Sequence, residues 1–298
     1  MQYSCDSIYG VMADVTSTAV DQSNRPRYAA RAGYDAWYLT FCDADQGVGV
    51  WLRWTAMRFH AGVDGQPHSA MWAFVLHRGR PDLHAGVREF HEYDPTFRDL
   101  RAGKIASAGR SAQWELTFES EAAPFAYVPR VLERFLPTGN SMAHPRLAVS
   151  GTIELDGHPF TFKKAPGGQG HTWGSSHAPS WTWAHAALPR GWITGASTPL
   201  GSPYGLELDG RRRSRTGIAA ALARGELVSN RWTAEEIEVT VDLDDCVSVE
   251  YQDPTGGRRV CNHSEFGRMT IGGELVSRTA AFEFAAAGPL PGRPPIQL

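Results

Sequence analysis

The sequence is poor in cysteine, and its cysteines form no recognisable framework. Cys5, Cys42, Cys246 and Cys261 are the four cysteines among 298 residues, and no two of them stand as a CxxC pair. A chain of this length with so few cysteines does not rely on a disulfide framework for its stability. We therefore expect reduced cysteines and a cytoplasmic location.

Long apolar runs and an excess of charge are missing as well. No segment approaches the ~20 apolar residues that cross a bilayer, and residues 1–15 lack the basic start and apolar core of a signal peptide. The 29 basic and 32 acidic residues give a formal net charge of −3. This balance provides no basic patch, so we expect no nucleic-acid partner and no stable membrane insertion.

Helical periodicity is scarce, whereas short aromatic segments between turn residues recur along the whole chain. The 10 Trp, 9 Tyr and 13 Phe favour strands, and the scattered 31 Gly and 19 Pro suit many turns. This pattern predicts an all-β protein built from sandwiches or barrels. The expected strands lie at 34–41, 48–55, 69–76, 113–118, 147–155, 160–162, 181–187, 192–194, 204–208, 237–243, 247–251, 269–271 and 281–284.

The length of the chain suits two packed β-domains better than one small barrel. We expect an N-terminal domain at 1–165 and a C-terminal domain at 166–298, with a glycine-rich run at 167–170 near the junction. The best candidate for a helix is 126–136, with Pro129 in its first turn. The proline-rich tail at 288–298 is expected to be extended or disordered.

The segment GHTWGSSHAPSWTWAHA at 170–186 concentrates histidine and tryptophan. In a strand at 181–187, Trp181, Trp183 and His185 would share one face. Tryptophan supplies apolar area and attracts developing positive charge, and histidine exchanges protons near neutral pH. The pattern favours a site for a hydrophobic ligand, and its main alternative is a packed core in which the ring N–H groups meet backbone carbonyls.

Other kinds of site find less support in the sequence. A zinc site made from His171, His177 and His185 has a spacing that matches no familiar ligand motif. There is no GxxxxGK[ST] loop for a nucleotide and no GxSxG nucleophile elbow for an esterase. We predict no metal site and no organic cofactor.

The segment at 170–186 resembles the signature of the hydroxyneurosporene synthase (carotenoid 1,2-hydratase) and AttH-type superfamily. That superfamily is similar to plant tocopherol cyclases and to lipocalin-like Diels–Alderases. The segments GYDAWYLTF to VWLRWT at 33–55 and YQDPTGGRRVCNHSEFGRMTI at 251–271 agree with it. The resemblance implies two packed domains of the lipocalin-like or β-sandwich-barrel kind, the second a lipocalin-like barrel. It also implies an apolar pocket at or near their interface and no organic cofactor.

The resemblance also implies roles for individual residues. His171 and Trp173 match the H-x-W pair of the family, and Asp35 lies in its first matched strand. We expect His171 or His185 to transfer a proton, with Asp35 as an orienting carboxylate. The residues expected to bind the substrate are Trp37, Trp51, Trp173, His177, Trp181, Trp183 and Tyr204.

The leading hypothesis is a cofactor-independent lyase or isomerase for an unsaturated hydrophobic small molecule such as a terpenoid or polyketide. It would be a hydratase or a cyclase, including the Diels–Alderase type. The alternative is a lipocalin-type carrier or sensor without catalysis, and a third reading is a scaffold-like protein with a filled pocket. A cavity that is polar at only one end favours chemistry, whereas a uniformly apolar one favours carriage. A second copy of the chain, in a homodimer, is the macromolecular partner we consider.

Overall fold

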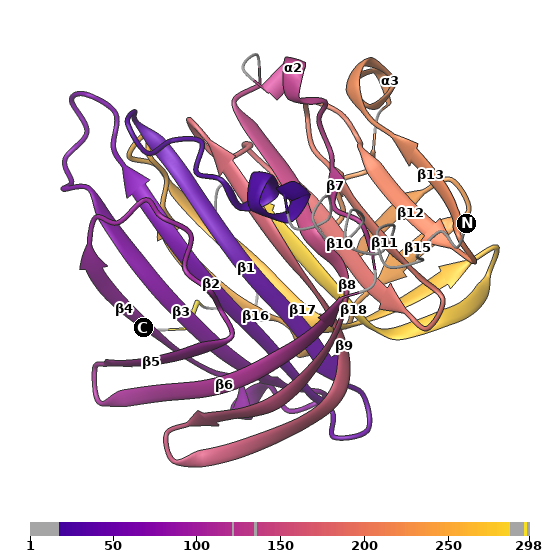
Figure 1. The fold of residues 1–298 in the computed structure, drawn as a ribbon, viewed down its shortest axis with the longest axis horizontal. Coiled ribbons are helices and arrows are strands. Elements are labelled where there is room, and N and C mark those ends of the chain that lie inside the picture. Colours follow the sequence, from indigo (N-terminus) through magenta and orange to yellow (C-terminus); the bar gives the residue numbers. More distant parts are fainter. Residues whose placement is uncertain (1–17, 121, 134–135, 224, 287–294, 297–298) are drawn as a thin grey trace, which may run out of the picture.

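The structure is a computed structural model that describes residues 18–120, 122–133, 136–223, 225–286 and 295–296. Two nine-stranded antiparallel sheets account for most of it (Figure 1), so the predicted all-β fold is confirmed. No helix among these residues is long and apolar enough to cross a membrane. Cys5 and most of the predicted tail at 288–298 lie outside the described residues.

The first sheet, sheet A, curls around its own core until its two edge strands meet. Its strands, in chain order, are β1 (Gly33–Asp43), β2 (Val48–Arg58), β3 (His68–His77), β4 (Ala85–Glu92), β5 (Ala102–Ser107), β6 (Arg110–Ser120), β7 (Phe125–Ala126), β8 (Thr138–Leu155) and β9 (His158–Gly174). The spatial order is β4-β3-β2-β1-β9-β8-β6-β5, with β7 paired to β8 and with β4 lying against β5. The short helices η1 (Pro81–Leu83) and α2 (Arg130–Glu133) lie in its connections.

The second sheet, sheet B, has the same order of connections. Its strands are β10 (Trp181–Leu188), β11 (Gly191–Ser197), β12 (Tyr204–Leu208), β13 (Arg211–Arg215), β14 (Arg231–Ala234), β15 (Ile237–Thr240), β16 (Val247–Gln252), β17 (Arg258–Ile271) and β18 (Glu274–Ala286). The spatial order is β13-β12-β11-β10-β18-β17-β15-β14, with β16 paired to β17. The helices α3 (Gly217–Leu222) and η2 (Leu243–Asp245) connect strands of this sheet, and residues 18–24 are helical before β1.

Two sequence expectations differ from the observed elements. The helix predicted at 126–136 is wrong at its start, where β7 occupies 125–126, and among the described residues of this range only Arg130–Glu133 is helical. Pro129 disfavours a helical conformation at the residue before it, which leaves the preceding segment extended. The expected domain boundary between 165 and 166 falls inside β9, and the chain passes from sheet A to sheet B at 175–180.

Alternation along the central strands gives each sheet two buried faces. On β1, Trp37, Leu39 and Phe41 lie in the core of sheet A, whereas Tyr38 and Cys42 belong to a cluster shared with sheet B. On β10, Trp183 lies in the shared cluster and Ala184 in the core of sheet B, as the predicted strand alternation requires. The shared cluster includes Tyr38, Trp51, Trp72, Phe74, Phe125, Tyr127, Trp183, Trp192 and Phe266.

The two sheets approach each other closely where glycine replaces a larger side chain. A Cβ atom added to Gly49 on β2 would lie 2.3 Å from the Cβ of Glu265 on β17. A Cβ added to Gly168 on β9 would lie 2.3 Å from Nε2 of His185 on β10. Both distances are shorter than a van der Waals contact, so the packing of the sheets depends on glycine at these positions.

We expect Gly49→Ala to destabilise the protein by about 1–3 kcal/mol, because the added methyl group overpacks the contact between the sheets. Gly257→Ala is the matched control, since an added Cβ there meets no atom within 4 Å. Chemical denaturation of both variants measures the difference in the free energy of unfolding. Equal stability of the two variants would show that the sheets do not pack as closely as described.

Candidate functional site

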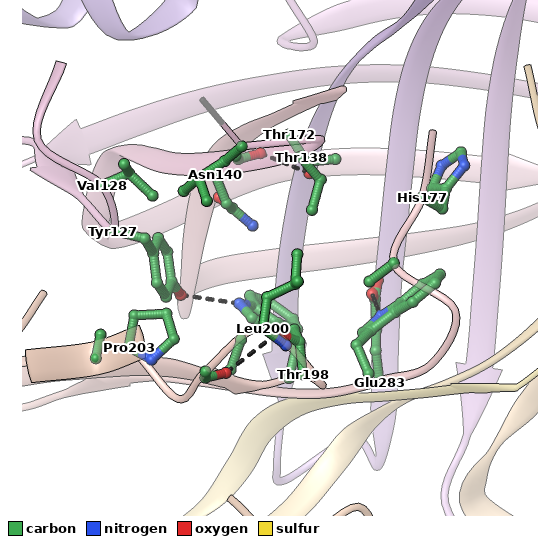
Figure 2. Close-up of a pocket in the computed structure, with 18 of the residues that line it drawn as sticks. Tyr127, Val128, Thr138, Asn140, Thr172, His177, Thr198, Leu200, Pro203 and Glu283 are labelled. Atoms are coloured by element: carbon green, nitrogen blue, oxygen red, sulfur yellow. Dashed lines mark hydrogen bonds between the residues drawn. The ribbon is translucent and has the colours of Figure 1, made fainter. Parts of the chain in front are cut away.

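A cavity of about 280 Å³ lies between the two sheets. This volume is near the lower end of the range for small-molecule sites. Val128 and Pro203 lie on one side of the cavity, with His177 and Glu283 on the other (Figure 2). Ile218 of α3 also lines it and is 74% exposed, so the cavity opens beside this helix. The aromatic side chains of the wall are Tyr34, Tyr38, Trp51, Tyr127, Trp181, Trp183 and Tyr251.

Strand register explains which side chains reach the cavity. Tyr34 and Tyr38 stand four residues apart on β1 and therefore lie on the same face of this strand, toward the cavity. Arg53 of β2 is paired with Tyr38 in the neighbouring strand. From sheet B, the indole Nε1 of Trp183 donates a hydrogen bond of 3.0 Å to the hydroxyl of Tyr127. This bond fixes the Trp183 ring at the wall of the cavity, and Figure 2 marks it with the dashed line from Tyr127.

Glu283 of β18 places a carboxylate in this wall, among the aromatic rings. Its side chain is 18% exposed, and it accepts hydrogen bonds from Nδ1 of His263 at 3.1 Å and from Nε1 of Trp181 at 3.3 Å. Burial alone would raise the pKa of Glu283, but the hydrogen bond and charge of His263, with a smaller contribution from Arg53, lower it. Glu283 is therefore ionised at neutral pH.

His263 of β17 lies behind Glu283 and is held by a second carboxylate. Its Nε2 lies 2.6 Å from Oε1 of Glu265, which also accepts a hydrogen bond from the hydroxyl of Thr40 in sheet A. Burial alone would lower the pKa of His263, but the charge of Glu265 and the bonds to both carboxylates raise it to about 9. The ring also stacks on Trp51 at 4.4 Å, so this imidazolium joins the two sheets.

His177, in the connection between β9 and β10, forms a second polar pair at the cavity. Its Nδ1 lies 2.9 Å from Oδ2 of Asp253, and its ring stacks on Tyr34 with centroids 3.8 Å apart. The carboxylate only accepts hydrogen bonds, so Nδ1 carries the proton, while Nε2 has no partner among the described residues. Burial lowers the pKa of His177, which keeps the ring neutral at pH 7.

Asp253 is held by several donors of its own. It accepts hydrogen bonds from the backbone N–H of His177 at 2.8 Å and from the backbone N–H and hydroxyl of Thr255. Burial alone would raise the pKa of Asp253, but the hydrogen bond from the His177 side chain, together with these bonds, holds it well below its ordinary value. Beside this pair, the buried hydroxyl of Tyr251 has no partner among the described residues, and its ring lies 4.9 Å from His177.

Four of the residues expected from the sequence lie at the cavity: Trp51, His177, Trp181 and Trp183. His171 and Asp35 are brought together, with Nε2 of His171 2.9 Å from Oδ1 of Asp35, but both lie outside the cavity lining. Asp35 also accepts the backbone N–H groups of Arg27 and Tyr28 at 2.8 Å each. The pair is buried, and it holds the chain that precedes β1.

Trp37, Trp173, His185 and Tyr204 also lie outside the cavity lining. Trp37 stacks on His171 at 4.6 Å, and Trp173 packs against the same ring. Burial lowers the pKa of His185 to about 4, so this ring is neutral in the packing between the sheets. Tyr204 lies in the core of sheet B, with its hydroxyl bonded to Glu235.

Sequence reasoning missed the charged residues of the site. Arg53 and Glu283 lie in expected strands between apolar or aromatic neighbours, and His263 lies in the matched segment 251–271. A charged side chain in a buried strand needs a partner or a ligand, and this was the signal that could have found them. Among the described residues, no three His, Cys, Asp or Glu side chains are arranged to hold a metal ion.

Comparisons with known proteins give the fold and a distant relative. No protein-family model matches the sequence. The uncharacterized protein Rv0493c of Mycobacterium tuberculosis (strain H37Rv) is 26% identical over 284 residues, covering 83% of this chain and 84% of that protein. The same figures hold for the uncharacterized protein MT0513 of strain CDC 1551.

A crystal structure from Nitrosomonas europaea, provisionally named AttH, matches with a TM-score of 0.56 and 10% identity, over 88% of this chain and 94% of that one. This match shows a shared fold. Kievitone hydratase from Nectria haematococca matches with a TM-score of 0.43 and 9% identity, over 89% and 94% of the two chains. A likeness this weak carries no argument about function.

The buried His263 predicts a dependence of stability on pH. Its pKa is raised from 6.5 to about 9, so the stabilising proton is fully bound below pH 6.5 and is lost as the pH rises to 9. The associated fall in the free energy of unfolding is at most about 3 kcal/mol. Denaturation curves between these pH values measure it.

His263→Gln should remove this contribution to the slope. His158→Gln, at an exposed position of the β8–β9 hairpin, should keep it. The same slope in His263→Gln and in the unsubstituted protein would contradict a buried imidazolium.

Proposed function

We propose that the chain is a lyase or isomerase of the hydratase or cyclase kind. It would act without an organic cofactor on an unsaturated hydrophobic small molecule such as a terpenoid or polyketide. The carrying observation is the ionised Glu283 in a cavity rich in aromatic side chains, supported from behind by the imidazolium of His263. The AttH-like fold and the resemblance of 33–55, 170–186 and 251–271 to the hydroxyneurosporene synthase superfamily support this class.

The protonation state of Glu283 decides its role. A carboxylate whose pKa is lowered is a poor acid at neutral pH, so it accepts a proton rather than protonating an isolated alkene. Its natural target is a C–H bond next to a carbonyl group, or a water molecule beside an activated double bond. Glu283 thus takes the role that the sequence suggested for His171 or His185.

Negative charge that develops on the substrate needs a donor, and Tyr251 can supply one. Burial raises the pKa of Tyr251 well above its ordinary value, so the hydroxyl stays protonated. It has no other partner among the described residues, and it is free to donate to an enolate oxygen. The base and donor together suit a double-bond shift, the addition or loss of water, or ring closure.

The aromatic wall would contribute by holding one conformer of a flexible substrate. Trp181, Trp183 and Tyr127 are fixed by hydrogen bonds or stacking, so their rings form a rigid surface. Such preorganisation lowers the entropic part of a barrier to cyclisation. The alternative of a carrier would suit a uniformly apolar cavity, whereas Arg53, Glu283 and Tyr251 add charged and hydroxyl groups to the wall of this one. The free, buried Cys42 and Cys261 support the expected cytoplasmic location.

We expect Glu283→Gln to lower turnover by about 10²–10⁴-fold, the usual contribution of a general base. The assay incubates the protein in D₂O with β-ionone, citral and 4-phenylbut-3-en-2-one, and mass spectrometry detects deuterium gained next to the carbonyl or added D₂O. Glu250→Gln, outside the cavity on β16, is the control and should keep full activity.

His171→Gln distinguishes catalysis by Glu283 from the catalysis by His171 that the sequence suggested. It should lower stability without lowering the turnover of the folded molecules, because His171 lies outside the cavity lining. Probes that quench tryptophan fluorescence on binding and yet gain no label with the unsubstituted protein would favour the carrier.

A further inference from the structure

Arg53 is a buried cation in the wall of the cavity. It comes from β2, is 8% exposed and lines the cavity. Its Cζ lies 6.0 Å from the ring centroid of Trp51, 5.9 Å from that of Trp72 and 5.5 Å from that of Tyr251. Three aromatic rings of the protein therefore lie around the guanidinium.

The hydrogen-bonding capacity of this guanidinium is mostly unused. Nε donates to Oγ1 of Thr55 at 3.0 Å, and neither Nη atom has a hydrogen-bond acceptor among the described residues. Within the same residues, no carboxylate oxygen lies within 4.0 Å of its nitrogens. The two Nη atoms thus leave four N–H donors for a ligand.

The carboxylates near Arg53 are occupied by other donors. Glu283 and Glu265 are both bonded to His263, and Asp253 is bonded to His177. The positive charge of His263 lies directly between its two partners. None of these groups is the direct counter-ion of the arginine.

A buried cation without a hydrogen-bonded anion costs several kcal/mol, so the site is incomplete as it stands. The planar fork of a guanidinium matches the two oxygens of a carboxylate, and many of the other residues in the wall are apolar or aromatic. We propose that the cavity binds an apolar carboxylic acid whose carboxylate pairs with Arg53. This inference rests on the proposed function and deepens it, since it gives the substrate an acidic group that fixes its orientation toward Glu283.

The test compares ligands that differ only in charge. The probes are the phenylalkanoic acids with chains of four to eight carbons and their methyl esters, titrated into the full chain at pH 7 by calorimetry and tryptophan fluorescence. We expect at least one acid to bind about 10–100-fold more tightly than its ester, the usual value of a charge-assisted hydrogen-bonded pair.

Variants locate the preference. Arg53→Gln should remove it by weakening only the acid, and Arg53→Lys should retain part of it through the remaining charge. The matched control is Arg98→Gln, because Arg98 also lies over a tryptophan ring, at 4.2 Å from Trp54, but outside the cavity lining. Arg98→Gln should change the affinity of neither the acid nor its ester.

Equal binding of acids and esters, or no binding by any acid, would overturn the inference. This comparison uses the unsubstituted protein, so it does not depend on whether a variant folds. An equal loss for acid and ester in Arg53→Gln would overturn it as well. These binding measurements need no turnover. If the protein selects acids through Arg53 but labels no enone, the binding of a carboxylate by Arg53 stands and the proposed catalysis is wrong. If it labels an enone but does not select acids, the proposed catalysis stands and the inference about Arg53 is wrong.

Discussion

The imidazolium of His263 and its two carboxylates form the interaction on which the site depends. Glu265 connects this group to Thr40 of sheet A, and the ring itself stacks on Trp51 of the same sheet. Water is largely excluded between the sheets, so a charge there is stable only when it is paired and hydrogen-bonded. The pairing keeps Glu283 ionised at the cavity wall. The same group of residues therefore holds the two sheets together and sets the charge of the proposed catalytic base.

The sequence predicted the features that depend on local patterns. Period-two alternation identified most central strands, and it placed Trp181 and Trp183 on the face that proved to border the cavity. Aromatic content and turn residues predicted the fold class. The strands predicted at 147–155 and 160–162 belong to β8 and β9, which the Asp156-Gly157 turn joins with positive φ at both residues. Edge strands such as β5 and β13 were missed because β5 consists mostly of small residues and β13 mostly of exposed arginines, so neither shows a clear alternation.

The remaining features depend on which face of a strand meets which sheet. Asp35 and Trp37 stand one residue away from Tyr34 and Tyr38, and that offset turns them into the core of sheet A with His171. Their chemistry is the same in either position, so residue types alone could not separate a structural pair from a site. Glu283 and His263 are paired on the adjacent strands β18 and β17, but no local pattern in the sequence predicts that these two side chains are in contact.

The central claim is that a protonated His263 keeps Glu283 ionised at the wall of the cavity. Nitrogen-15 NMR of histidine-labelled protein, with His263→Gln used to assign the signal, tests it directly. The account predicts that both ring nitrogens of His263 carry protons at pH 7 and that the ring titrates with a pKa of about 9. A neutral His263 ring at pH 7 would contradict the account, because Glu283 would then lack the charge that holds it ionised.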